Sequence, residues 1–160
     1  MIYFTIEELT HSSTATRLGV DNTPSTPHYE NLIEMTDHLL DPLRDAWAGY
    51  CHSHHLGTPA LQVTSGYRGF RLNQAVGGIP SSAHCYGLAV DLVPHNRQLK
   101  AFKIFCRQWL ATRDFDQMIS EKESADGTPR WIHLGYRHPS GRQRHQMLSM
   151  RKGKYIPQTA

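Results

Sequence analysis

Apolar residues recur at helical spacing in two stretches of the chain. Between residues 30 and 47, leucine, isoleucine and tryptophan side chains fall on one face of a helix. Pro42 interrupts this pattern, so we expect the helix to kink or to restart there, with Asp41 as its cap. A second apolar stripe predicts a helix over residues 97–112, with Asn96 as its N-cap.

Four short segments rich in apolar and β-branched residues predict strands instead: residues 61–64, 88–93, 115–121 and 131–136. The last two are joined by a turn-rich connection around Gly127, which predicts an antiparallel hairpin. We therefore expect an α+β fold: a small, mostly antiparallel sheet with helices packed on one side.

The remaining segments are predicted to be short or irregular. Thr5 and Glu8 have capping-box spacing, so a short helix is expected to run to about Thr10. Residues 11–28 are rich in Ser, Thr, Pro and Asn and predict a surface loop, whereas residues 71–75 predict one or two helical turns. A loop is also expected after the first long helix, and it would hold His52, His54 and His55.

Composition indicates one domain over residues 1–160, large enough for a core without disulfide bridges. The three cysteines, Cys51, Cys85 and Cys106, are odd in number and lack CxxC spacing. This excludes a thiolate zinc cluster and a disulfide framework, and predicts free thiols. The count of 11 histidines is high and favours a metal or proton-transfer site somewhere in the chain.

Charge is unevenly distributed. Residues 137–160 carry six Lys/Arg and no acid, and we expect them to form a basic C-terminal tail. Such a tail suits an anionic polymer such as cell wall, and a solvated tail that aids solubility is the plain alternative. Basic and aromatic residues are not interleaved, so we expect no nucleic-acid partner.

No apolar run is long enough for a membrane span, and the N-terminus has neither a basic region nor a long apolar region of the kind found in signal peptides. We therefore expect a monomer made in the cytoplasm and then released, or a phage-encoded protein.

Asp91 is a carboxylate in the middle of an otherwise apolar strand, and burying it without a cation would be costly. His84 lies seven positions earlier, ahead of Gly87, which can bend the chain back. A metal ion shared by both side chains answers the cost of the carboxylate.

The predicted hairpin supplies further candidates. If it is centred near Gly127, Glu121 lies opposite His133 and both project from one face of the sheet. His84, Asp91 and His133 would then leave a fourth position for water, as in a catalytic zinc site. From spacing alone, a loop histidine and a hydrogen-bonded strand histidine remain the alternative.

Three motifs of this sequence resemble those of the zinc D-Ala-D-Ala peptidases of the M15 type. They are S-x-H-x-x-G-x-A-x-D over residues 82–91, W-x-H over residues 131–133, and Ser-Gly-Tyr-Arg over residues 65–68. The resemblance covers roughly residues 3–137. It implies the fold that these peptidases share with the Hedgehog signalling domain, with a Zn²⁺ site on the open face of the sheet.

The resemblance also implies roles for individual residues. The zinc ligands would be His84, Asp91 and His133. Arg68 would bind the carboxylate of the substrate or its polarised carbonyl oxygen, because a guanidinium is always charged and offers a bidentate fork. Ser82 and Tyr86 would line the substrate cleft.

The sequence departs from some relatives at the general base. Several of them carry an acid three residues before the last histidine, where this chain has Arg130. Glu121 is the best candidate to take the proton from the attacking water, and Glu123 and Asp126 are the other acids nearby.

The function implied is a zinc metallopeptidase that hydrolyses peptidoglycan stem-peptide bonds involving D-amino acids. It would act at the cell wall or in the periplasm as a D,D-carboxypeptidase or a murein endopeptidase, with a phage endolysin as one form that such an enzyme takes. The alternative is a zinc-containing cell-wall-binding module without catalysis, which the presence of Arg130 keeps open.

Overall fold

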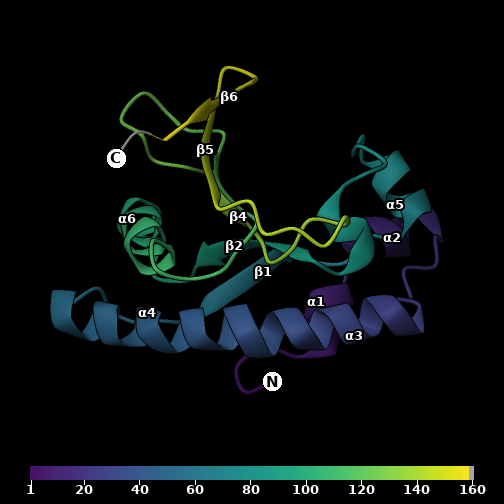
Figure 1. Cartoon of the computed structure of the whole chain (residues 1–160), viewed down its shortest axis with the longest axis horizontal. Coiled ribbons are helices and arrows are strands. Elements are labelled where there is room, and N and C mark those ends of the chain that lie inside the picture. The colour runs from purple at the N-terminus through teal and green to yellow at the C-terminus, as the bar shows by residue number, and fades with distance from the viewer. Residues whose placement is uncertain (159–160) are drawn as a thin grey trace.

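A computed structural model describes residues 1–158, in which helices cover one face of a six-stranded sheet (Figure 1). The strands are β1 (Leu61–Ser65), β2 (Ala89–Pro94), β3 (Gln117–Glu121), β4 (Trp131–Gly135), β5 (Gln146–Arg151) and β6 (Lys154–Pro157). Their order is β1-β2-β4-β3-β5-β6, and only the β3–β5 pair is parallel. The predicted α+β class with a mostly antiparallel sheet is confirmed.

Strands β5 and β6 lie in the segment expected to be a basic tail, so that expectation was wrong for residues 146–157. The segment has little alternation of apolar and polar residues, and tertiary pairing with β3 supplies its order. Three of its bases are also bound to acids: Arg137 to Glu34, Arg144 to Asp116 and Arg151 to Glu123.

The hairpin of β3 and β4 forms as predicted but in a different register. Its centre lies at Asp126 rather than Gly127, because the Asp126 carboxylate accepts hydrogen bonds from the Ser124 hydroxyl and the Thr128 amide and so organises the turn. As a result Glu121 pairs with Trp131, and Ile119 pairs with His133. The shift is two residues, so Glu121 and His133 still project from the same face.

The helices are α1 (Ile6–Thr10), α2 (Ser13–Leu18), α3 (Thr26–Met35), a π-helical turn η1 (Thr36–Leu40), α4 (Asp41–His54), α5 (Phe70–Ala75), a 3₁₀ turn η2 (Ala83–Tyr86) and α6 (Leu99–Leu110). The capping box at Thr5 and Glu8 is present. The loop expected over residues 11–28 is wrong in part, because Ser12 caps α2. Helix α4 extends further than expected, so His52 and His54 are helical.

Pro42 neither kinks nor restarts the long helix. Helices α3 and α4 continue through the π turn, where the Asp41 amide donates to the carbonyl of Thr36 five residues back. This wider turn accommodates a residue that lacks an N–H and would crowd the preceding carbonyl of a regular helix. The Asp41 side chain is therefore not a cap, and it accepts hydrogen bonds from the amides of Ile2 and Tyr3 instead.

The core lies between the sheet and the helices α3, α4 and α6 (Figure 1). Trp47 of α4 contacts the rings of Phe102 and Phe105 on α6. Asn96 is not the cap of α6, because the helix begins later, at Leu99, and the Asn96 side chain accepts from the Gln98 amide in the preceding turn. The core residues contributed by the strands are Leu61, Val90, Leu92, Met118, Ile132 and Leu134.

All three cysteines are buried free thiols, as predicted. Within residues 1–158, no helix has the length and apolar character that a membrane crossing requires.

Candidate active site

Three side chains on the open face of the sheet converge on one point: His84, Asp91 and His133. Asp91 and His133 are direct partners on the central strands β2 and β4, so the sheet itself sets their spacing. His84 comes from η2, and Gly87 turns the chain from there into β2 with a φ of 70°. A Cβ at Gly87 would lie 2.5 Å from the His28 carbonyl oxygen, so only glycine fits this turn against α3.

The spacing of the three groups fits a tetrahedral metal ion. Nδ1 of His133 lies 3.0 Å from Oδ1 of Asp91, and 3.2 Å from Nε2 of His84. Nε2 of His84 lies 3.5 Å from the same carboxylate oxygen. Ligands 2.0–2.1 Å from a tetrahedral zinc are about 3.3 Å apart, close to these values. The three residues could therefore hold a metal ion on three of its four positions.

The protonation of His84 also suits a metal ligand. Its Nδ1 lies 2.8 Å from the carbonyl oxygen of Gly66, to which it donates, so in the neutral ring Nε2 carries a lone pair directed at the other two groups. Burial lowers the pKa of His84 and favours that neutral form. In this neutral form, the lone pair on Nε2 of His84 could bind a metal ion.

Asp91 stays ionised despite its position. Burial by itself would raise the Asp91 pKa, but positive charge on His84 when that ring is protonated and the hydrogen bond from His133 outweigh it and hold the pKa well below its usual range. Burial of the Asp91 carboxylate would be costly without a cation, and the carboxylate is an anion within a group that could hold one.

Glu121 ends strand β3 next to this group. It lies diagonally from His133 on the same face of the sheet, a relation that separates residues by about 7–8 Å. Burial raises the pKa of the Glu121 carboxyl, and the nearby Asp91 adds to the effect. A carboxyl with a raised pKa, beside residues that could hold a metal ion, is a stronger base than an ordinary glutamate and suits proton transfer.

Arg68 reaches the site from the loop after β1. A bulge at Thr64 lets Ser65 pair with Asp91, and the Arg68 amide then donates to the carbonyl of His84. One terminal guanidinium nitrogen lies 3.4 Å from the Ser82 hydroxyl, whereas the buried Nε has no hydrogen-bond partner within the described chain. Arg68 is half-buried, and an N–H that lacks a partner is a donor that an anion or a carbonyl oxygen could satisfy.

No pattern in the sequence pointed to Asn22, whose side chain binds the segments on both sides of Arg68. Its amide nitrogen donates to the carbonyls of Thr10 and Tyr67, and its oxygen accepts from the Gly69 amide. In the sequence it is one polar residue among many in a turn-rich segment, so nothing distinguished it.

Ser82 and Tyr86, also predicted to line the cleft, lie at the start and the end of η2. Ser82 contacts Arg68 as described, and the Tyr86 ring packs edge-on against Phe70 and His28 at the rim. Cys85 follows His84 in the sequence, but it is fully buried. It does not belong to His84, Asp91 and His133, the three residues called the metal-binding group below because they could hold a metal ion.

The remaining acids are engaged elsewhere. Glu123 is bound to Lys103 and Arg151, and Asp126 is bound within its turn. Arg130 is exposed, and its amide donates to the carbonyl of Glu121, which closes the hairpin beside that residue. Of the three acids considered for the base, Glu121 is therefore the one that lies beside His133 and is not bound by a basic side chain in the described residues.

A family model described as Peptidase M15 matches residues 2–134, which include all the residues placed in the site above. No curated protein matches the chain in a sequence search.

Proposed function

The chain belongs to the peptidase M15 family, and on this premise we propose that it is a zinc-dependent peptidase that hydrolyses peptidoglycan stem-peptide bonds involving D-amino acids. It acts at the cell wall as a D,D-carboxypeptidase or a murein endopeptidase, of the kind that phage lysins provide. One observation carries the proposal. His84, Asp91 and His133 could hold a metal ion and leave its fourth position free, and Glu121, a carboxyl with a raised pKa, lies beside them.

Each residue has a distinct task in this proposal. His84, Asp91 and His133 would hold the zinc ion, which when bound would supply Lewis-acid chemistry: polarisation of a carbonyl and a lower pKa of water. Glu121 accepts the proton of the attacking water and delivers it to the leaving amine. Arg68 donates its unpaired N–H to the carboxylate or the carbonyl oxygen of the peptide, and so fixes the peptide relative to the ligands.

Replacing Glu121 by glutamine tests the assignment of the base. The amide keeps the shape of the side chain but cannot take a proton, so we expect kcat to fall about a hundredfold to ten-thousandfold. Zinc content should stay at one ion per chain, because Glu121 is not a ligand. The measurements are mass spectrometry of fragments released from purified sacculi and metal analysis of the same samples.

Glu30→Gln is the matched control, since Glu30 is exposed on α3. It should retain full activity. Equal activity of Glu121→Gln and the parent protein would reject Glu121 as the base. A parent protein that binds zinc and sacculi but releases no fragment would instead favour a zinc-containing cell-wall-binding module.

A further inference from the structure

The C-terminal hairpin of β5 and β6 extends the open face of the sheet beyond the metal-binding group. It lies outside residues 2–134, the part matched by the family model. In Figure 1 both strands, drawn in yellow, rise away from the long helix α3–α4 at the upper end of the sheet. Tyr155 of β6 is 59 % exposed there.

The strand pairing places Tyr155 on the same face as the candidate site. His133 pairs with Ile119, and Ile119 pairs with Leu148 of β5. Met150, two residues after Leu148, therefore projects from this face as well, and it pairs with Tyr155. The row Glu121, Met150, Tyr155 runs parallel to the row His133, Ile119, Leu148.

The phenol of Tyr155 shares this face with the acidic groups of the candidate site. Burial raises its pKa, and the negative charges of Glu121 and Asp91 raise it further. The hydroxyl therefore stays protonated and can donate a hydrogen bond. The strand pairing places Tyr155 two strands away from Glu121 in the same row of the open face.

Side chains of different polarity thus lie on the two sides of the candidate site. Arg68 and Ser82 stand on the side of β1 and η2, and they offer charge and polar atoms. On the side of β5 and β6 the floor is apolar, with Leu148 and Met150 half-buried and Tyr155 above them. A surface of this kind suits small apolar side chains next to a peptide carbonyl.

We propose that Tyr155 is a substrate-binding residue that holds the peptide on the side of the scissile bond opposite to Arg68. Its ring packs against the methyl group of an alanine residue, and its hydroxyl donates to a peptide carbonyl oxygen. This inference rests on the proposed function, since it takes the ligand to be a stem peptide.

The test measures binding and turnover separately. Binding of a synthetic stem pentapeptide ending in D-Ala-D-Ala is followed by calorimetry with zinc-loaded Glu121→Gln protein, in which turnover is blocked. Tyr155→Ala should weaken binding about tenfold and Tyr155→Phe about threefold, as expected for the loss of a ring contact and of one hydrogen bond. In the active background, the same variants should raise KM by these factors and leave kcat within about twofold.

Ile156→Ala is the control, because Ile156 is 47 % exposed on the opposite face of the same strand. It should leave binding unchanged, and Tyr155→Phe preserves the shape of the hairpin if Tyr155→Ala unfolds it. Hydrolysis with KM unaffected in both Tyr155 variants would overturn the role of Tyr155 while the proposed function stands. Tyr155-dependent binding without hydrolysis by the parent would reject the proposed function alone, and absence of both binding and hydrolysis would reject both.

Discussion

At the scale of single residues, the site depends on backbone positions as much as on ligands. The Gly66 carbonyl fixes the tautomer of His84, and the next amide, that of Tyr67, donates to the carbonyl of Leu9 at the end of α1. The close approach of these two segments leaves no room for a side chain at position 66. A contact between an N-terminal helix and a strand end thereby orients a candidate metal ligand.

Replacing Gly66 by alanine tests this dependence. The added Cβ would lie 2.1 Å from the Leu9 carbonyl oxygen, so the backbone must shift and take the acceptor of His84 with it. We expect a loss of about 1–3 kcal/mol in the free energy of unfolding. Zinc affinity should fall about 10–100-fold, as for other losses of a partner behind a ligand. Urea unfolding and competition with a zinc chelator measure the two effects.

Gly49→Ala provides the comparison, because no atom lies within 4 Å of a Cβ built at this helical glycine of α4. It should stabilise the protein by about 0.5–1 kcal/mol and leave zinc affinity unchanged. A Gly66→Ala protein that binds zinc as tightly as the parent would separate the Gly66 carbonyl from the function of His84.

At the scale of elements, a buried ion cluster attaches the C-terminal hairpin to the rest of the sheet. The fully buried Glu123 carboxylate follows β3 and binds Lys103 of α6 and Arg151 of β5. It also accepts a hydrogen bond from Ser149, 2.7 Å away. Three elements distant in sequence therefore meet on one carboxylate, and this contact holds β5 and β6 where Tyr155 can face the site.

The Glu123 cluster makes stability depend on acid. Burial alone would raise the Glu123 pKa, but its hydrogen bonds, led by that from Lys103, lower the pKa from 4.5 to about 2. Since the folded state favours the ionised form, the contribution is complete above pH 4.5 and is lost as pH falls toward about 2. Glu123→Gln should cost about 3 kcal/mol at neutral pH, because it leaves Lys103 buried without its charge partner.

Urea unfolding at several pH values measures this effect, with Glu30→Gln as the control for an exposed acid. The parent should lose stability more steeply than Glu123→Gln between pH 4.5 and about 2. Parallel pH profiles for the two proteins would show that Glu123 does not carry the acid dependence.

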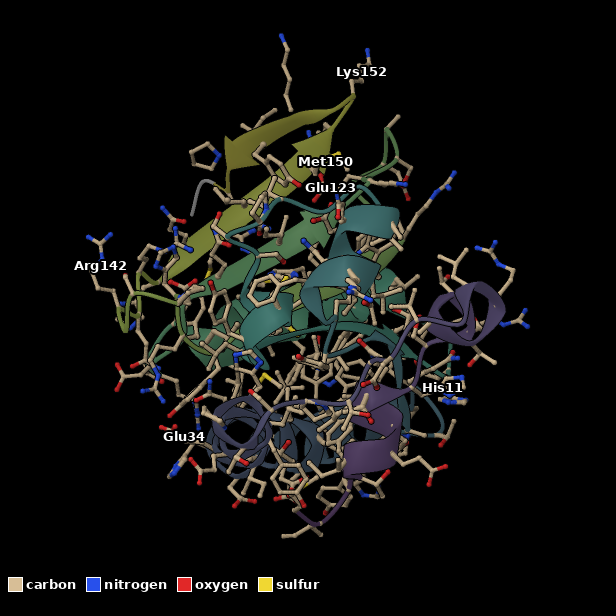
Figure 2. All side chains as sticks on the ribbon, turned by 90° about the vertical axis from the view of Figure 1, so that its right-hand side faces the viewer. His11, Glu34, Glu123, Arg142, Met150 and Lys152 are labelled. Carbon is tan, nitrogen blue, oxygen red and sulfur yellow. The ribbon has the colours of Figure 1, made fainter. Side chains whose placement is uncertain are left out.

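At the scale of the whole molecule, the six strands form one surface with two functions. One face closes the core over the long helix, and the other presents the metal-binding group between Arg68 and the apolar floor. The six basic residues of the C-terminal segment also have two roles, because within residues 1–158 three of them bind acids of the fold and the other three do not. Arg142 and Lys152 project from separate parts of the surface in Figure 2, and Lys154 is also exposed.

Within residues 137–158, these three bases are exposed and are not bound to an acid, so they could contact an anionic cell wall. Replacing Arg142, Lys152 and Lys154 by glutamine should weaken pelleting with purified sacculi roughly tenfold at low salt, because each base near an anionic surface contributes about 1 kcal/mol or less. The difference should disappear at about 1 M salt, where charges are screened beyond about 3 Å. Equal pelleting at low salt would exclude charge as the basis of wall binding. Deletion of residues 138–160 is unsuitable as a test, since it removes β5 and β6.

The sequence by itself determined the fold class, the central strands and the pairing of a carboxylate with histidines. Burial of Asp91 in an apolar strand is costly unless a cation binds the carboxylate, which indicated a metal site. Short motifs then pointed to His84 and His133 as its partners. Alternation along the strands was enough to put Glu121 and His133 on one face, because a shift of two residues does not change the face of a side chain.

Only the tertiary structure decided the hairpin register, the continuous helix through Pro42 and the strands β5 and β6. The hairpin register depends on side-chain bonds within its own turn, from Ser124 and Thr128 to Asp126, which the alternation along the strands does not reveal. The helix through Pro42 and the strands β5 and β6 depend on partners distant in sequence: the amides of Ile2 and Tyr3 that bind the Asp41 carboxylate, and the pairing of β5 with β3. Local propensity is weak in these segments, so long-range contacts set their conformation. For the same reason the position of Tyr155 over the site could not be predicted, because it follows from strand order rather than from any motif.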